Sequence, residues 1–350
     1  MMVNAGVFDI SPEGRAGTLH FLYRQFLFHP PLVSPHDVDL RGKTAIVTGS
    51  NSGIGFECAR QLLDLGLSKL IIAVRDLQKG EASKRELHST GIAAAASIEV
   101  WKLDLSSYGS ILEFAEQTKS LERLDIAILN AGVLRTSMVF NENTGHEEGV
   151  QVNYLSTALL LILMLPIIQS KNPVSRPGRL VLVSSDQASW SKFEHKEEEG
   201  SILSSLDKKT EQFDPRQRYA TTKLLGQLFL VKLTQVVPAS VAIINCANPG
   251  LCYGSGLSRD VAGTAIGYMV AIEMRLLGRL PAVGARVIVD AATKHGTESH
   301  GQYIEDCQIR PLAPLVYTAE GERLGNLLWE ETMRELAPVG VRAVLEKLRM

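Results

Sequence analysis

Tyr219 and Lys223 are the residues whose chemistry and spacing suggest proton transfer. They are four positions apart at the start of a strongly helical segment, so both side chains share one helix face. A phenol titrates at about pH 10, and a nearby ammonium group favours its ionised form. A tyrosine made more acidic in this way can exchange a proton with a carbonyl or an alcohol at neutral pH. A surface tyrosine beside an exposed lysine would show the same spacing.

A glycine-rich stretch after the apolar run 44–48 is the second candidate site. Its glycines allow a tight turn and let a pyrophosphate approach bare backbone. The helix expected after the turn would offer free N–H groups and its positive dipole end to phosphates. The residues predicted to hold a dinucleotide are Gly49, Ser50, Asn51, Ser52, Gly53, Ile54 and Gly55. A purely structural strand-to-helix turn is the alternative.

Arg75 follows the second apolar run, where a parallel sheet would place the adenosine ribose of such a ligand. A guanidinium suits the 2′-phosphate of NADP, whereas a carboxylate there would hold the 2′-hydroxyl of NAD. We therefore expect NADP(H) to be preferred, with NAD(H) possible because Asp76 comes next in the chain. An arginine that simply lies on the surface is the other interpretation.

Short apolar runs alternating with helical patterns must position these residues. The runs lie at 44–48, 70–74, 98–103, 124–129, 180–183 and 241–244, with a last short one at 302–304. This alternation predicts an α/β fold: a doubly wound, mostly parallel, seven-stranded sheet with helices on both faces, Rossmann-like and single-domain. Its crossover connections should be right-handed.

The chain is expected to have three parts: an N-terminal extension (1–40), the main domain (41–310) and a C-terminal tail (311–350). Aromatic residues of the extension would cover the domain's own surface, line a substrate entrance or touch a membrane face. Residues 251–282 are expected to form a lid over an apolar pocket; a core helix or a membrane-surface helix would also fit. The polar insertion 191–218 is most simply a solvated loop.

Composition excludes several classes of protein. The chain has 350 residues, 45% of them hydrophobic, and a net charge of −2, which argues against disorder and against nucleic acid as a partner. Its cysteines and histidines lack metal-ligand spacing, so no metal is expected. The apolar run 158–168 is too short to span a bilayer. With no secretory signal visible, we expect a cytoplasmic protein, with peripheral membrane association left open.

Taken together, the motifs resemble the short-chain dehydrogenase/reductase superfamily, in its ordinary single-domain branch. They follow the family's order over residues 40–310: Thr48-Gly-Ser-Asn-Ser-Gly-Ile-Gly55, Asn130-Ala131-Gly132, Asn153, Ser185, Tyr219-x-x-x-Lys223 and Asn248-Pro249-Gly250. Softer similarity in 26–31, 248–252 and 328–331 points to fungal members, including those of secondary metabolism. The insertion before Tyr219 is similar to one in retinol-dehydrogenase-like members.

The resemblance implies a role for each motif residue. Tyr219 would be the general acid/base, and Lys223 would bind the nicotinamide ribose and lower the tyrosine pKa. Ser185 would hold the substrate oxygen, and Asn153 would keep a water in a proton relay. Further cofactor contacts would come from Asp104, Asn130, Ala131, Gly132, Pro249 and Gly250.

Some of these roles have alternatives. Ser184 could be the catalytic hydroxyl instead of Ser185, although strand alternation points the two to opposite sides. Asn153 could satisfy backbone groups within its own helix. Asp104 could cap a helix. Leu251 stands where many family members carry threonine, which leaves a contact to the nicotinamide amide open.

We therefore expect an NADP(H)-dependent carbonyl reductase for a bulky, largely apolar carbonyl or secondary alcohol. An NAD-dependent alcohol dehydrogenase and a non-catalytic dinucleotide-sensing protein are the alternatives. By analogy with relatives, the helix at 145–169 and the helix beginning at Tyr219 would pair two chains into a homodimer.

Overall fold

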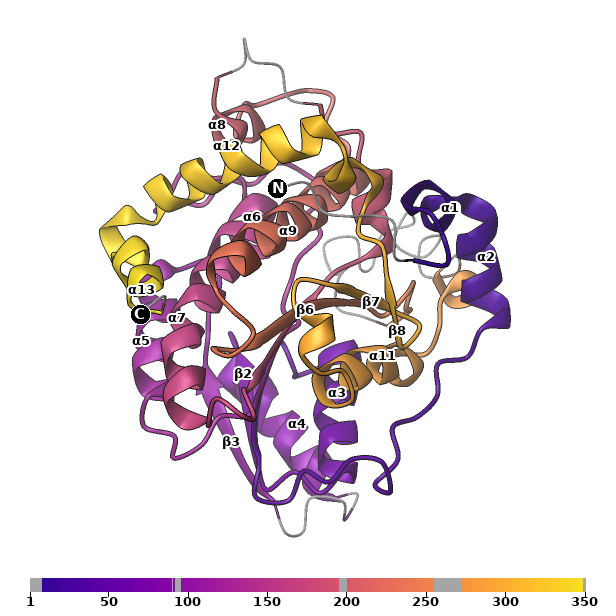
Figure 1. Ribbon diagram of the computed structural model, residues 1–350, viewed down its shortest axis with the longest axis vertical. Helices are drawn as coiled ribbons and strands as arrows, with labels where there is room; N and C mark the ends of the chain where they lie inside the picture. The colour runs from indigo at the N-terminus through magenta and orange to yellow at the C-terminus, as the bar shows by residue number, and fades with distance from the viewer. Residues whose placement is uncertain are drawn as a thin grey trace.

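One eight-stranded sheet organises the computed structural model, which describes residues 8–89, 91, 96–194, 200–254, 272 and 274–348 (Figure 1). The strand order is β3-β2-β1-β4-β5-β6-β7-β8, and every neighbouring pair is parallel except β7 and β8. The strands are β1 (Thr44–Thr48), β2 (Lys69–Val74), β3 (Ser97–Lys102), β4 (Ile126–Leu129), β5 (Arg179–Val183), β6 (Ile243–Asn248), β7 (Tyr303–Glu305) and β8 (Gln308–Arg310). The doubly wound, mostly parallel α/β fold expected from the sequence is confirmed.

The expected count of seven strands is wrong, because β8 adds an antiparallel edge strand. Asp306 (φ 51°) and Cys307 (φ 61°) are both in the left-handed region and form a two-residue hairpin turn. Positive φ at both central residues gives the turn a twist that suits antiparallel strands. β8 has only three residues, two of them polar, so it leaves no apolar run in the sequence.

Helices cover both faces of the sheet. They are α1 (Pro12–Ala16), α2 (Thr18–Leu27), α3 (Gly53–Asp64), α4 (Leu77–Ser89), α5 (Tyr108–Thr118), α6 (Glu148–Val150), α7 (Ser156–Lys171), α8 (Ile202–Leu206), α9 (Pro215–Val236), α11 (Pro281–Thr293), α12 (Ala319–Glu335) and α13 (Val341–Lys347). A π-helical turn (Gln151–Leu155) precedes α7, and a 3₁₀ helix (Asp186–Trp190) follows β5.

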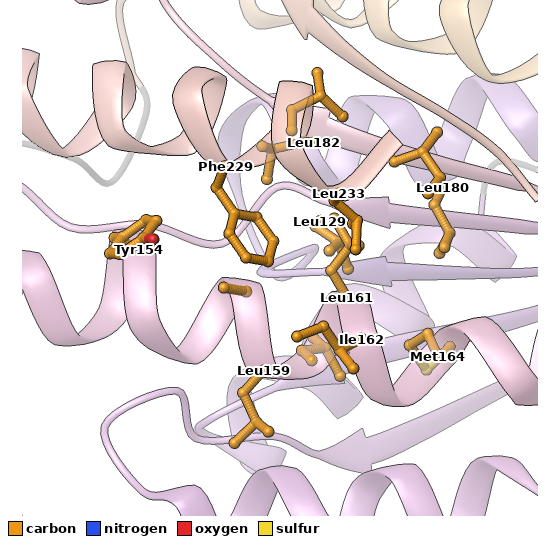
Figure 2. Close-up of a cluster of buried hydrophobic side chains, with 14 of the residues drawn as sticks. Leu129, Tyr154, Leu159, Leu161, Ile162, Met164, Leu180, Leu182, Phe229 and Leu233 are labelled. Atoms are coloured by element: carbon orange, nitrogen blue, oxygen red, sulfur yellow. The ribbon is translucent and has the colours of Figure 1, made fainter. Parts of the chain in front are cut away.

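Strand alternation divides the core into two hydrophobic clusters. In β5, Leu180 and Leu182 join one cluster, whereas Val181 and Val183 join the other. The first cluster takes side chains from α5, α7, α9, α12 and α13, and the second from α3, α4 and α11. Figure 2 shows part of the first cluster, in which Phe229 of α9 reaches toward the helix that carries Leu161. Both faces of the sheet are therefore buried, as a parallel sheet requires.

The stretch Glu148–Lys171 is long and apolar enough to cross a membrane, judged by length and composition alone. Within the part of the chain that the structure describes, no other helix meets that test. In Glu148–Lys171, 89% of the apolar window is buried inside the protein. A helix that is apolar on all sides is also what the interior of a large core needs. Its burial makes α7 a core helix of this fold.

The C-terminal residues pack on the domain. α12, yellow in Figure 1, lies along α9, where Trp329 stacks on Phe229 with ring centroids 5.5 Å apart. Glu331 of α12 accepts hydrogen bonds from the backbone N–H groups of Ile202 (2.8 Å) and Leu203 (2.9 Å). The expectation of a solvated loop is thus wrong for Ile202–Leu206, because apolar side chains on this short helix are buried.

Two glycines of α12 predict opposite effects of the same substitution. A Cβ on Gly321 would lie 1.8 Å from the backbone oxygen of Leu315, whereas the nearest atom to one on Gly325 would be Cε in the flexible side chain of Lys232, 3.2 Å away. We expect Gly321→Ala to lower the free energy of unfolding by about 1–3 kcal/mol through overpacking. Gly325→Ala, the matched control, should be neutral or stabilise by up to about 1 kcal/mol. Urea denaturation followed by circular dichroism measures both, and equal shifts would contradict the packing of α12.

Candidate active site

The candidate residues converge because β1, β4, β5 and β6 are parallel and end at one edge of the sheet. The glycine turn follows β1, Asn130 follows β4, and Ser185 follows β5 after one residue. Pro249 and Gly250 follow β6 directly. The arrangement brings together segments that are up to about two hundred residues apart in sequence, at the position where α/β sheets bind ligands.

The glycine turn is shaped for close backbone approach. Gly49 (φ 66°) and Gly53 (φ 58°) are in the left-handed region, and α3 begins at Gly53. A Cβ on Gly55 would lie 2.5 Å from Nδ2 of Asn130 and 2.6 Å from the oxygen of Gly49. Glycine is therefore required here by packing, and the cradle at the start of α3 fits a pyrophosphate group.

Polar side chains brace this turn from within. Nδ2 of Asn130 donates to the oxygen of Thr48 (3.0 Å), and the N–H of Ala131 donates to Oγ1 of Thr48 (2.9 Å). Oγ of Ser50 donates to the oxygen of Val47 (2.8 Å), and Oγ of Ser83 to the oxygen of Asn51 (3.0 Å). Asn130 and Ala131 thus fix β4 against the glycine turn.

The end of β2 presents positive charge. Arg75 is exposed, and Nζ of Lys102 donates to its backbone oxygen at 2.6 Å. Asp76 accepts from the N–H of Lys79 (3.1 Å) and so caps the start of α4. Sequence reasoning missed Lys102; the signal was its place at the end of β3, in register with Val74. Two cations therefore lie where an adenosine ribose would bind.

Asp104 does not cap the following helix. Its Oδ1 accepts from the N–H of Ser106 (3.0 Å) and from the Ser106 hydroxyl (2.6 Å). The cap of α5 is Ser107, whose side chain accepts from the N–H of Ser110. Asp104 instead holds the loop at the end of β3 in a tight turn.

Tyr219 and Lys223 lie in the first turns of α9, behind the end of β5. Asp214 caps this helix, accepting from the N–H groups of Arg216 (2.9 Å) and Gln217 (3.1 Å). The side chain of Ser185 lies beside the Tyr219 hydroxyl. Nζ of Lys223 lies 5.5 Å from the centroid of the Tyr219 ring and donates to the oxygen of Val183 (2.8 Å).

Burial controls the ionisation of this pair. Burial raises the pKa of Tyr219, and the polar side chain of Ser185 acts in the opposite direction. Burial also lowers the pKa of Lys223 to about 8. The expected lowering of the tyrosine pKa by Lys223 stays a prediction. Nζ of Lys223 donates to the oxygen of Val183, and Lys223 is not among the groups that shift the pKa of Tyr219.

Ser184 and Ser185 point to opposite sides of the strand end. Oγ of Ser184 accepts from Nε2 of Gln227 (3.1 Å), and the residue is only 4% exposed. Ser185 faces Tyr219 and also accepts from the N–H of Gln187 (3.3 Å). The structure thus brings Ser185, and not Ser184, to the tyrosine hydroxyl.

Asn153 lies in the π-helical turn before α7, a helical irregularity that often marks functional sites. Its side-chain amide accepts from the N–H of Val133 (2.8 Å) and donates to the oxygen of the same residue (2.8 Å). It also donates to Oγ1 of Thr222 at 3.1 Å. A Cβ on Gly132 would lie 3.1 Å from Oδ1 of Asn153 and 3.9 Å from Nζ of Lys223. Asn153 therefore ties the segment after β4 to α9 beside the candidate catalytic pair.

Gly250 completes the edge after β6. Its φ is 75°, and its N–H donates to Oδ1 of Asn248 (3.0 Å). The backbone of Leu251 is bonded to Gln25 of α2, a contact that sequence reasoning did not foresee. Most of the expected lid (251–282) lies outside the described residues, which resume at 272 and 274. Among the residues that are described, no cluster of His, Cys, Asp and Glu could hold a metal ion.

Comparisons with known proteins identify the family. Residues 43–196 match the short chain dehydrogenase family model. The chain is 47% identical over 346 residues to a short-chain dehydrogenase of Aspergillus ruber, covering 98% of this chain and 99% of that protein. It is 42% identical to a short chain dehydrogenase/reductase of Annulohypoxylon moriforme, covering 97% and 98% of the two chains.

Solved structures share the fold. An uncharacterised protein from Mycobacterium paratuberculosis is 23% identical, with a TM-score of 0.61, covering 87% of this chain and 97% of that one. RhlG of Pseudomonas aeruginosa, solved as an active-site complex with NADP, is 22% identical with a TM-score of 0.55, covering 82% and 100%. The two fungal relatives are 47% and 42% identical to this chain over nearly the full length of both proteins. The chain therefore belongs to the short-chain dehydrogenase/reductase family of oxidoreductases, which use nicotinamide dinucleotide cofactors.

Proposed function

We propose that this protein is an NADP(H)-dependent carbonyl reductase of fungal secondary metabolism, acting on a bulky, largely apolar carbonyl or secondary alcohol. The observation that carries the proposal is the proximity of the Ser185 side chain to the Tyr219 hydroxyl, with Lys223 one helical turn behind the tyrosine. A protein that only sensed dinucleotides would need the glycine turn alone. In this protein the hydroxyl groups of Ser185 and Tyr219, which can donate to a substrate oxygen, lie at the same edge of the sheet as the glycine turn.

The chain's own groups supply binding and proton transfer. The nicotinamide ring supplies or accepts the hydride when the coenzyme is bound. Ser185 would hold the carbonyl oxygen by donating its hydroxyl hydrogen, and Tyr219 would donate a proton to the same oxygen. The Lys223 ammonium would leave the oxygen of Val183 for the ribose hydroxyls, and Asn153 would order a water that returns the proton to the tyrosine.

The coenzyme preference is inferred from charge. Arg75 and Lys102 are both exposed at the carboxyl ends of neighbouring strands, and Asp76 is engaged in capping α4. A 2′-phosphate would therefore meet cations, whereas a 2′-hydroxyl would lack a free carboxylate at this position. The NADP named in the RhlG complex is consistent with this inference.

The apolar substrate is inferred from the ends of the lid segment. Among the described residues there, Ile272, Leu276 and Leu280 are 62%, 73% and 53% exposed. Exposed leucine and isoleucine side chains near the sheet edge at Gly250 favour an apolar ligand over a sugar or a hydroxy acid. Relatives from Aspergillus and other fungi support a role in fungal metabolism.

A homodimer and a cytoplasmic location complete the proposal. The four cysteines are unpaired, which suits a reducing compartment. The helix pair expected to form the dimer is covered by the chain itself, because α12 packs on α9 and α13 on α7. A dimer, supported by family analogy, would have to use another surface, and light scattering of the purified protein tests it.

Ser185 and its neighbour offer a matched test of the reaction. We expect Ser185→Ala and Tyr219→Phe each to lower kcat by about 10²–10⁴-fold, because each removes a donor to the substrate oxygen. Ser184→Ala should keep kcat within about threefold, since that hydroxyl bonds to Gln227. NADPH oxidation with a panel of aromatic ketones and quinones measures all three. A Tyr219→Phe enzyme as active as wild type would exclude the proposed chemistry.

Arg75 predicts coenzyme discrimination. The wild type should show higher kcat/KM with NADPH than with NADH. Arg75→Ala should lower kcat/KM for NADPH by about 10–100-fold, because it removes a charge-assisted contact to the 2′-phosphate. It should leave kcat/KM for NADH unchanged. Arg41→Ala is the control, because Arg41 is an exposed arginine that pairs with Asp39 in the loop before β1. A clear preference of the wild type for NADH would reject this part of the proposal.

The pKa of Lys223 predicts an alkaline limit. Burial lowers it to about 8, so the side chain is charged below that pH and loses its charge above it. Only the charged form offers all three donors to the ribose and an attractive field to a phenolate. We therefore expect kcat/KM for NADPH, which reports the free enzyme, to fall roughly tenfold per unit above pH about 8. A profile that stays flat up to about pH 10 would show that Lys223 is not needed in its charged form.

A further inference from the structure

The N-terminal extension inserts two arginines into the protein interior. Arg15 of α1 is 2% exposed and Arg24 of α2 is 5% exposed. Nη1 of Arg15 pairs with Oε1 of Glu305 at 3.1 Å. Nη1 of Arg24 lies 2.9 Å from Oδ1 of Asp186 and 2.9 Å from Oε1 of Glu305. Figure 1 shows α1 and α2, in indigo, beside the β7–β8 end of the sheet.

These arginines balance buried negative charge. Three buried carboxylates, Asp186, Glu305 and Asp306, meet three buried arginines, Arg15, Arg24 and Arg279. The extension supplies two of the three positive charges. Burying carboxylates without partners is unfavourable, so the interior of the domain depends on the extension for electrostatic balance.

Arg24 pairs with Asp186, the residue that follows the candidate catalytic Ser185. Asp186 follows Ser185 directly and begins the 3₁₀ helix that Ser185 caps. Burial would raise the pKa of Asp186, but the charge of Arg24 and the nearby polar side chain of Asn248 hold it below its usual value. The carboxylate of the residue next to Ser185 is therefore held in an ion pair with Arg24 (2.9 Å).

The same extension holds the other end of this 3₁₀ helix. Nε1 of Trp190 donates to the oxygen of Ala16 at 2.8 Å. The ring of Phe21 packs edge-on against Trp190, with centroids 5.1 Å apart. Both ends of the helix that follows Ser185 are thus fastened to residues before position 28.

Gln25 reaches the second loop of the site. Its amide donates to the oxygens of Leu251 (2.9 Å) and Leu277 (2.8 Å) and accepts from the N–H of Leu251 (3.2 Å). A Cβ on Gly250 would lie 3.2 Å from Oε1 of Gln25. The loop proposed to contact the coenzyme after β6 therefore packs directly on α2.

We propose that Arg24 and Gln25 are positioning residues of the active site: Arg24 orients Ser185 through Asp186, and Gln25 orients the coenzyme loop at 249–251. The inference rests on the proposed function and assigns the extension a part in it. The extension contacts both the 3₁₀ helix after Ser185 and the loop 249–251. Because turnover depends on how these two segments hold the reacting groups, the extension contributes to that geometry. The extension is thus a component of the site and not a separate appendage.

Three variants separate positioning from simple stabilisation. Arg24→Gln should lower kcat for NADPH oxidation with phenanthrenequinone by about tenfold or more, with KM within about threefold. Gln25→Ala should raise the Kd of NADPH, followed by its fluorescence, by about tenfold. Arg15→Gln is the control for the coenzyme loop, because Arg15 is equally buried in the extension but bonds to Glu305, Tyr303 and Ser189, and not to Leu251 or Leu277. It should lose thermal stability and keep the Kd of NADPH within about threefold below its melting temperature.

A double-mutant cycle tests the route from Arg24 to Ser185. If Arg24 acts through Asp186, the Arg24→Gln/Asp186→Asn enzyme should be no slower than the slower single variant. Arg24→Lys, which keeps the charge, should restore part of kcat and serves in place of Arg24→Gln if that variant does not fold. Additive losses, unchanged kcat and Kd in folded variants, or an equal rise in the Kd of NADPH in Arg15→Gln would each overturn the proposal.

The two proposals fail in different ways. A wild type that binds NADPH but turns over no carbonyl would reject the proposed reaction alone. The comparison of NADPH affinity between Gln25→Ala and Arg15→Gln would still decide whether the extension positions the coenzyme loop. A wild type that binds no NADPH would overturn both.

Discussion

Parallel pairing of the central strands is the constraint on which the rest of the structure depends. Because β1 to β6 run in the same direction, their carboxyl ends must lie at one edge, and the candidate residues follow these ends or pack behind them. Parallel sheets require both faces to be covered, so the apolar helices α7 and α9 fill one side and α3 and α11 the other. The same packing buries Tyr219 and Lys223 and shifts both of their pKa values.

The sequence was informative where local chemistry determines structure. The glycine turn could be predicted because a left-handed backbone and a crowded neighbour leave glycine as the residue that fits. Tyr219 and Lys223 could be placed together because helix spacing alone brings them to one face. Strand alternation also anticipated that Ser184 and Ser185 would point to different sides. Each of these predictions uses interactions within a few residues of chain.

Long-range pairing limited what else could be predicted. No local pattern shows that Arg24 meets Asp186, 162 residues later in the chain. β8 is short and polar, and it exists because a left-handed turn folds it back on β7. No local pattern shows that the Lys223 ammonium donates to the oxygen of Val183, which lies 40 positions earlier on another element. Tertiary contacts outweigh local preference in each case.

The buried contact between Arg15 and Glu305 also has a consequence for biosynthesis, because the two residues are 290 positions apart. A ribosome adds about 5–20 residues each second, so roughly 15–60 seconds pass between their syntheses. During that interval Arg15 and Arg24 of the first two helices lack the carboxylate of Glu305, with which both pair in the finished protein. The first helices of the chain are therefore among the last to reach their native places, and nascent protein becomes competent only after the final strands emerge.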